Sequence, residues 1–122
     1  MAPTARSFED IGIWQKAHQF VLEVYKMTEA FPKHELFGLT SQLRRAAVSV
    51  PANFAEGFRK MSKVDKLRFY GIAQSSLEEC RYYLRLANDL SYQNTSIMRS
   101  NLEEISKMLT SYTNKIRSDI RK

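Results

Sequence analysis

The amino-acid sequence predicts an all-α fold, an up-down-up-down four-helix bundle in a single domain that spans residues 1–122. Apolar residues recur three and four positions apart in four separate segments, which is the spacing of one face of a helix. The 4 Gly and 3 Pro are too few for a sheet-rich fold with many tight turns. A chain of 122 residues that is 43% hydrophobic can build one core, and short loops between the segments make consecutive helices antiparallel neighbours.

The first helix is predicted over about residues 11–30. Its apolar face begins with Trp14, Ala17 and Val21, which are separated by three and four residues. Pro32 ends this helix, because a proline disfavours helical angles at the residue before it.

The second helix is predicted over about residues 36–60, with a proline in its middle. Pro51 has no N–H to bond the Ala47 carbonyl, and its ring pushes the preceding residue away from helical angles. We therefore expect this helix to be kinked or broken at the proline. Ser49 is expected to cap the second part, which would place Pro51 in a first turn, where its missing N–H costs little.

The third and fourth helices are predicted over about residues 63–90 and 96–120. Each has a regular stripe of residues at alternating intervals of three and four, the pattern by which helices pack at a shallow angle. The stripe of the third helix is Tyr70, Ala73, Leu77, Cys80, Leu84 and Ala87, and that of the fourth is Met98, Leu102, Ile105, Leu109, Tyr112 and Ile116. Both stripes are expected to face the core.

The third helix has a second apolar stripe beside the first. Its members are Phe69, Ile72, Tyr83, Leu86 and Leu90. A helix of an isolated four-helix bundle needs only one apolar face. The second stripe therefore indicates either an unusually wide core face or an interface between subunits, and the pattern alone leaves both interpretations open.

Positive charge is expected to gather at one end of the bundle. The up-down-up-down topology places the N-terminus, the turn between the second and third helices and the C-terminus together, and we call this end the basic pole. Its candidate nucleic-acid-binding residues are Arg59, Lys60, Lys63, Lys66, Arg68, Lys115, Arg117, Arg121 and Lys122, with Arg6 as a tenth cation. Five acidic residues share this end: Glu9, Asp10, Glu56, Asp65 and Asp119. Such a surface attracts phosphate backbones, although solvated charge that aids solubility is the competing interpretation.

Three aromatic residues, Phe58, Phe69 and Tyr70, lie among these charges in the sequence. Aromatic rings beside cations can stack on unpaired bases. All three also fall at core spacing, so a place in the core is the stronger interpretation.

No motif for catalysis, cofactor binding or a metal site is found. His18 and His34 have no second ligand at zinc spacing, and no nucleotide-binding glycine pattern is present. Glu78 and its neighbour Glu79 point about 100° apart on a helix and cannot act as a carboxylate pair, so Glu78 is expected to pair with Arg81. We expect a protein that is not an enzyme, needs no cofactor or metal, does not enter a membrane and resides in the cytoplasm, since no apolar run approaches a membrane span.

Three segments together resemble a known family. They are FEDIGIWQKAH near the start, ELFGLTSQLRRAAVSVPANFAEGF in the middle, and FYGIAQSSLEE in the third helix. The chain resembles the four-helix bundle proteins encoded in 23S rRNA intervening sequences, and it is also similar to the accessory protein of diversity-generating retroelements, which works with a reverse transcriptase and RNA. The match covers about residues 8–90.

This resemblance implies a bacterial, cytoplasmic protein that forms a kinked four-helix bundle and assembles into a homo-oligomer of five chains. It brings no catalytic residues. The central motif contributes Ser49, Pro51, Asn53, Glu56 and Gly57, for which we expect structural roles, with Asn53 and Glu56 satisfying backbone groups freed by the proline. The leading hypothesis is a non-enzymatic oligomer that binds RNA through its basic pole. The alternative is a protein-interaction scaffold or accessory subunit with no nucleic-acid role.

Overall fold

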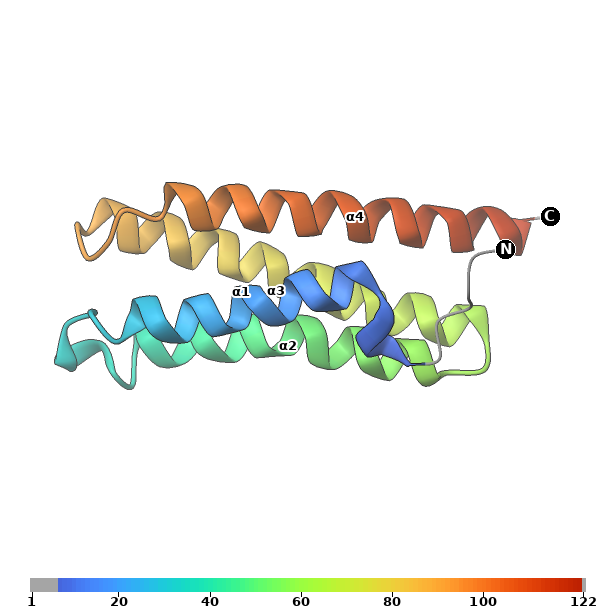
Figure 1. Ribbon diagram of the computed structural model, residues 1–122, viewed down its shortest axis with the longest axis horizontal. Helices are drawn as coiled ribbons and strands as arrows, with labels where there is room; N and C mark the ends of the chain where they lie inside the picture. The colour runs from blue at the N-terminus through green and yellow to red at the C-terminus, as the bar shows by residue number, and fades with distance from the viewer. Residues whose placement is uncertain (1–6, 122) are drawn as a thin grey trace.

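The computed structural model describes residues 7–121, which form four long helices and no strand (Figure 1). The helices are α1 (Gly12–Thr28), α2 (Leu39–Arg59), α3 (Lys63–Asp89) and α4 (Ser96–Arg121). Two short 3-10 helices, η1 (Phe8–Asp10) and η2 (Lys33–Glu35), precede α1 and α2. The all-α four-helix bundle predicted from the sequence is therefore confirmed.

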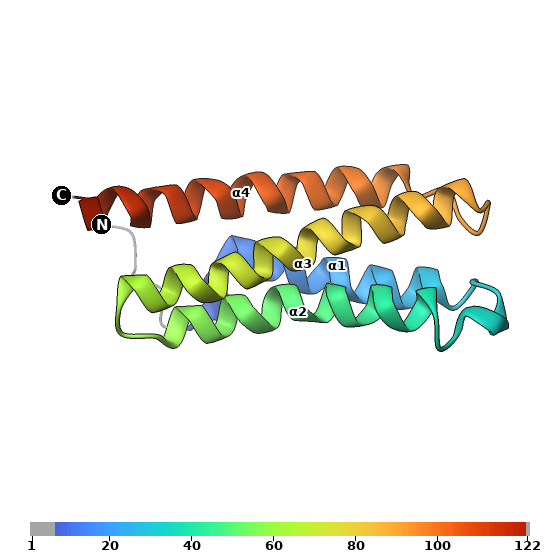
Figure 2. The same ribbon diagram turned by 180° about the vertical axis from the view of Figure 1, so that it is seen from behind.

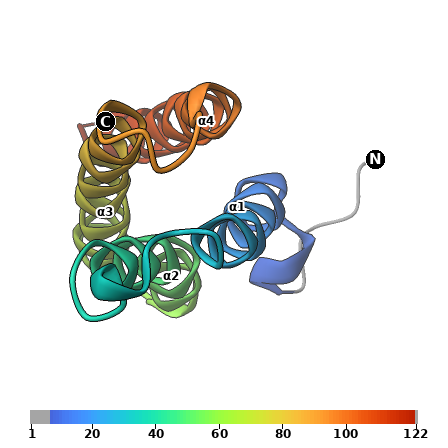
Figure 3. The same cartoon turned by 90° about the vertical axis from the view of Figure 1, so that its left-hand side faces the viewer.

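Consecutive helices run antiparallel, and the four axes stand at the corners of a quadrilateral (Figures 1 and 3). α1 and α3 each pack against α2 and α4. The diagonal helices α2 and α4 also meet through the rings of Phe54 and Tyr112, whose centroids lie 5.6 Å apart. The turn between α2 and α3, the segment that begins α1 and the end of α4 meet at one end of the bundle, as Figure 2 shows from behind. This is the arrangement that the basic pole requires.

The core consists of the apolar stripes of all four helices. Phe20 of α1, Leu43 of α2, Leu77 of α3 and Leu102 of α4 are all buried almost completely. Cys80 lies in the same core, where burial raises the pKa of its thiol to about 12. The regular stripes predicted from the sequence thus point inward, because burying their apolar surface is the main gain on folding.

α2 continues through Pro51 without a break, so the expected restart of the helix at Ser49 is wrong. The Ser49 hydroxyl instead accepts hydrogen bonds from the Ser76 hydroxyl of α3 (2.8 Å) and from the side-chain amide of Asn53 (2.9 Å). Packing against both α1 and α3 holds α2 in one piece despite the local preference of a proline. A bend of the axis without a break stays a prediction.

The two loops at the end opposite the basic pole are joined by Glu35. Its carboxylate accepts a hydrogen bond from the backbone N–H of Leu39 at the start of α2 (3.2 Å) and another from the Tyr92 hydroxyl (2.9 Å). The bond from Leu39, followed by that from Tyr92, lowers the pKa of Glu35. One side chain thus caps α2 and ties the α1–α2 loop to the α3–α4 loop.

Local hydrogen bonds cap α3 at both ends. Ser62 accepts from the backbone N–H of Asp65 (3.1 Å) as its N-cap. At the other end Tyr92 bonds back to the Ala87 carbonyl (2.9 Å), a Schellman motif in which Ser91 adopts a left-handed φ of 63°. A serine in the place usually taken by glycine makes this turn a sharp but strained stop to the helix.

Candidate nucleic-acid interface

The structure gathers the predicted basic residues where α2 ends, α3 begins and α4 ends (Figure 1). Lys122 and Arg6 lie outside the described residues. Of the other eight, Lys60 and Lys66 are half-buried, and the exposed ones are Arg59, Lys63, Arg68, Lys115, Arg117 and Arg121. The sequence-based expectation that these cations share one end of the bundle agrees with their positions, although they differ in what they contact.

The side chain of Lys66 has a structural role at the end of α2. Its ammonium donates to the carbonyls of Phe58 (2.7 Å) and Gly57 (3.2 Å), two of the last backbone acceptors of α2. Desolvation of this half-buried group lowers the pKa of Lys66. A cation at the carbonyl end of a helix is stabilised by the helix dipole, so Lys66 serves first as a cap for α2.

Two other cations make weaker contacts across or along the helices. Lys63 at the start of α3 lies 3.9 Å from the Asp119 carboxylate near the end of α4, and both side chains are about half exposed. Arg117 donates to the side-chain oxygen of Asn114 (3.2 Å) on its own helix. Exposed contacts of this kind contribute little to stability and leave both cations accessible to an anion.

Lys60 and Arg68 both precede Phe69 in the sequence, and the charged groups of both lie close to its ring. The Lys60 ammonium is 4.8 Å from the ring centroid, and the Arg68 guanidinium is 5.1 Å from it. Cations within about 6 Å of an aromatic face are attracted to it. Phe69 therefore orients two neighbouring positive charges at the mouth of the α2–α3 turn.

The aromatic residues of this region have separate roles. Tyr70 is completely buried, stacks on Phe54 with centroids 5.0 Å apart, and cannot meet a base, so it is excluded as a stacking residue. Desolvation of its hydroxyl, followed by the influence of Tyr112, raises the pKa of Tyr70. Phe58 and Phe69 are half-buried, and each lies under a cation.

The second stripe of α3 is divided between core and surface. Tyr83 and Leu86 pack against the buried core, and Phe69 lies beneath the two cations. Only Ile72 and Leu90 are exposed, by 43% and 46%. The wide-core interpretation therefore fits Tyr83 and Leu86, and Ile72 and Leu90 are the members of the stripe that a subunit contact would use.

The residues of the central motif differ in what they contact. The Asn53 amide donates to the backbone oxygen of Ser49 (2.8 Å), whereas Glu56 is exposed and bonds to none of the described residues, so its expected role at the backbone is wrong. Gly57 is buried against α3, and a Cβ placed there would lie 2.6 Å from Cε1 of Tyr70. Glycine thus allows α2 and α3 to approach at this point.

Two grooves were not found by sequence reasoning. A shallow apolar groove of about 290 Å³ runs between α1 and α2, lined in part by Trp14, Pro51 and Ala52. A larger groove of about 720 Å³ lies between α3 and α4, towards the end opposite the basic pole. Spacing along single helices could not reveal either, because each needs side chains from two helices whose relative rotation is set by packing.

The described residues offer no cluster of three His, Cys, Asp or Glu side chains that could hold a metal ion. None of their helices is long and apolar enough to cross a membrane. The expected pair between Glu78 and Arg81 is present, with Oε1 and Nη2 3.0 Å apart.

Comparison with known proteins identifies a family that matches this chain. The model of the family described as 23S rRNA-intervening sequence protein matches residues 9–111, which is most of the chain. The chain belongs to this family. The match to the 23S rRNA-intervening sequence protein family includes the central motif, Gly57 and the α2–α3 turn with its cations, whereas the cations near the end of α4 lie beyond it.

A solved structure shows the same fold. It is a protein of unknown function from the S23 ribosomal protein family of Bacteroides thetaiotaomicron, 23% identical to this chain, with a TM-score of 0.75. The similarity covers 83% of this chain and 97% of that one. No curated protein shows significant similarity. Neither the family nor this structure indicates an enzymatic activity.

Proposed function

We propose that the protein is a non-enzymatic, cytoplasmic RNA-binding protein that contacts phosphate groups through its basic pole. The observation that carries this proposal is the set of accessible cations around the α2–α3 turn and the end of α4. Arg59, Lys115 and Arg121 are exposed and bond to none of the described residues. Charges that the fold does not use are available to an anionic partner.

Lys60 and Arg68 add geometry to this charge. Because Phe69 attracts both, the two side chains are held near one another before any ligand binds. Ordering side chains in advance reduces the entropy lost on binding. The cations also occupy the neighbourhood of the ring, so we assign Phe69 the role of an anchor for them instead of a platform for a base.

The family supports RNA as the partner. Its description refers to intervening sequences of 23S rRNA, and the chain matches it over residues 9–111. A phosphodiester backbone offers repeated negative charges, which several separate cations on one surface can contact at once. We therefore favour RNA over a small acidic ligand at the basic pole.

Binding through phosphate contacts predicts a steep dependence on salt. For single-stranded RNA the slope of log affinity against log salt is roughly −0.7 per phosphate contacted, so about five contacts give about −3.5 and a loss of roughly a hundredfold between about 50 and 200 mM salt. Fluorescence anisotropy with a labelled single-stranded RNA measures this slope. If RNA is not retained even at low salt, the basic pole is a solvated surface, and the scaffold without a nucleic-acid role becomes the better interpretation.

We also propose that the protein acts as a homo-oligomer of about five chains, as its family resemblance implies. Ile72 and Leu90 remain exposed on α3 and would be covered by a neighbouring chain. Light scattering on the wild-type protein at micromolar concentration should give about five times the mass of one chain. A monomer under these conditions would contradict the proposal, and replacing Ile72 with aspartate should lower the mass if α3 forms the contact.

A further inference from the structure

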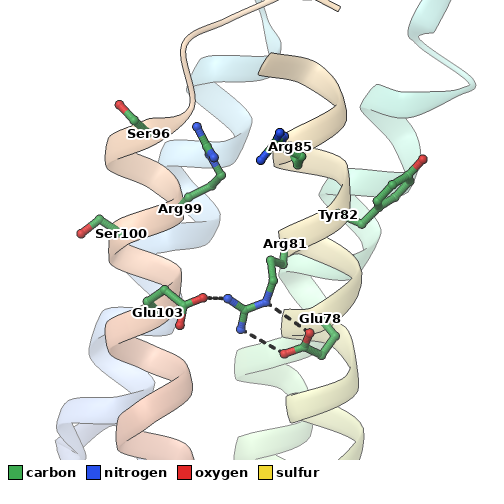
Figure 4. Close-up of a pocket in the computed structure, with 8 residues that line it drawn as sticks. All are labelled: Glu78, Arg81, Tyr82, Arg85, Ser96, Arg99, Ser100 and Glu103. Carbon is green, nitrogen blue, oxygen red and sulfur yellow. Dashed lines mark hydrogen bonds and ion pairs between the residues drawn. The ribbon is translucent and has the colours of Figure 1, made fainter. Parts of the chain in front are cut away.

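The groove between α3 and α4 has the composition of a binding site for an anion. Figure 4 shows that α3 contributes Arg81 and Arg85 and that α4 contributes Arg99. Its volume of about 720 Å³ falls within the range of small-molecule sites, which is about 300–1,000 Å³, and exceeds what a bare ion needs. The groove lies at the end opposite the basic pole, and nothing said above about RNA assigns a role to it.

Arg81 forms ion pairs with both carboxylates that line the groove. Its Nε and Nη2 donate to the two oxygens of Glu78 at 3.2 and 3.0 Å, and its Nη1 pairs with Glu103 on α4 (Figure 4). This guanidinium joins the two walls of the groove and neutralises part of the negative charge there. Glu78 and Glu103 are therefore engaged at one end of the groove, away from the other two arginines (Figure 4).

The side chain of Arg99 has no hydrogen bond or ion pair with any described residue, and its Nε is buried without a partner among them. Arg85 bonds Asp89 only through Nε, in a pair whose side chains are more than half exposed. The guanidinium groups of Arg85 and Arg99 face one another across the groove (Figure 4). Two like charges that face each other repel, and a desolvated donor without an acceptor costs free energy.

A single anion between the guanidinium groups of Arg85 and Arg99 would offset their repulsion and would give the buried Nε of Arg99 an acceptor. It would accept from the buried Nε of Arg99 and from the terminal nitrogens of Arg85, and the planar guanidinium fork matches the oxygens of a phosphate. Ser96 and Ser100 line the α4 side one turn apart, on either side of Arg99 in sequence. Their hydroxyls point away from the two guanidinium groups (Figure 4), and the start of α4 adds the positive end of a helix dipole.

We infer that the groove between α3 and α4 binds a phosphate-bearing ligand of about the size of a mononucleotide, with Arg99 and Arg85 holding the phosphate. Inorganic phosphate, a mononucleotide and the backbone of an oligonucleotide share this chemistry. The volume of the groove favours the mononucleotide. The site is separate from the basic pole, so this inference does not depend on the proposed function.

Thermal unfolding with added ligand tests the inference. AMP at millimolar concentration should raise the melting temperature of the wild-type protein, since a ligand that binds only the folded state stabilises it. Arg99→Ala and Arg85→Ala should each weaken AMP binding by about tenfold or more, the usual loss for a charge-assisted hydrogen bond. Without ligand, Arg99→Ala should melt no lower than wild type, because it removes a buried donor that has no partner.

The matched control is Arg45→Ala. Arg45 is an exposed arginine of α2 with no bond to the described residues, and its loss should leave the AMP response unchanged. Inorganic phosphate and a short oligoribonucleotide without terminal phosphates are tested in parallel. A response to AMP or to inorganic phosphate that Arg99→Ala removes and Arg45→Ala retains supports the inference. It is overturned if neither small ligand gives a response, if the two variants respond alike, or if Arg99→Ala affects only the oligoribonucleotide.

Discussion

Simultaneous replacement of Arg59, Lys60, Arg68 and Arg121 by alanine is expected to lower RNA affinity roughly a hundredfold. Four phosphate contacts of somewhat under 1 kcal/mol each, three from exposed side chains and one from half-buried Lys60, amount to about 2.7 kcal/mol, which corresponds to that factor. The salt slope should also flatten by roughly 2.8, because four phosphate contacts are lost. These four side chains are chosen because none of them bonds to another described residue, apart from the contacts of two with the Phe69 ring.

The contacts seen in the structure decide which cations can be replaced to test RNA binding without disturbing other interactions. Lys63 and Arg117, which sequence reasoning would include, already contact Asp119 and Asn114. Lys66 caps α2, so its replacement would confound binding with folding. The fourfold variant should keep the wild-type circular dichroism spectrum and oligomer mass, because exposed substitutions usually change stability by less than about 0.5 kcal/mol each.

A second fourfold variant serves as the control for charge. It replaces Lys26, Lys33, Arg45 and Lys107, exposed cations away from the basic pole that bond to none of the described residues. Arg99 is unsuitable as a control because it lines the α3–α4 groove. If both fourfold variants weaken RNA binding equally, net charge and not the basic pole is responsible, and the proposed function fails.

Gly57→Ala is expected to destabilise the protein by about 2 kcal/mol. The new Cβ would lie 2.6 Å from Cε1 of Tyr70 and 3.2 Å from Cβ of Phe69. The Tyr70 ring cannot move away, because Phe54 stacks on it at 5.0 Å and Tyr112 meets it edge-on at 5.5 Å. Overpacking of about 1–3 kcal/mol therefore outweighs the gain of up to about 1 kcal/mol that alanine brings to a helix interior.

Gly71→Ala is the matched control on α3. No atom lies within 4 Å of the Cβ that it would add, so only the helix propensity changes, and stability should rise by about 0.5–1 kcal/mol. Urea unfolding followed by circular dichroism measures both variants. The two changes should have opposite signs, and a stabilised Gly57→Ala variant would show that α2 and α3 do not approach as closely as described.

Much of the fold follows from local patterns. The stripe of Tyr70, Leu77 and Leu84 has the period of a helix over a long segment, and the cap at Ser62 fixes where α3 starts. Such signals lie within one segment and need no knowledge of its neighbours. The prediction at Ser49 failed for the opposite reason, since a hydrogen bond from Ser76, 27 residues away, gives this hydroxyl its partner.

The candidate sites were predictable only as far as topology determines them. An antiparallel order is enough to place Arg59, Lys63 and Arg121 at one end. It cannot show that Lys66 turns back onto α2, nor that Arg85 and Arg99 face each other, because both depend on the rotation of one helix against another. That rotation comes from side-chain packing, which sequence spacing does not contain.

The burial of Cys80 makes the natural chain a convenient background for site-specific dye attachment. With a thiol pKa of about 12, only about one molecule in ten thousand carries the reactive thiolate at about pH 8. A cysteine introduced at exposed position Arg45 would have an ordinary thiol pKa of about 8.5 and would react with a maleimide, whereas Cys80 would not react. A second labelling position at Arg121 marks the other end of the bundle, so energy transfer from a labelled RNA would report which end it approaches.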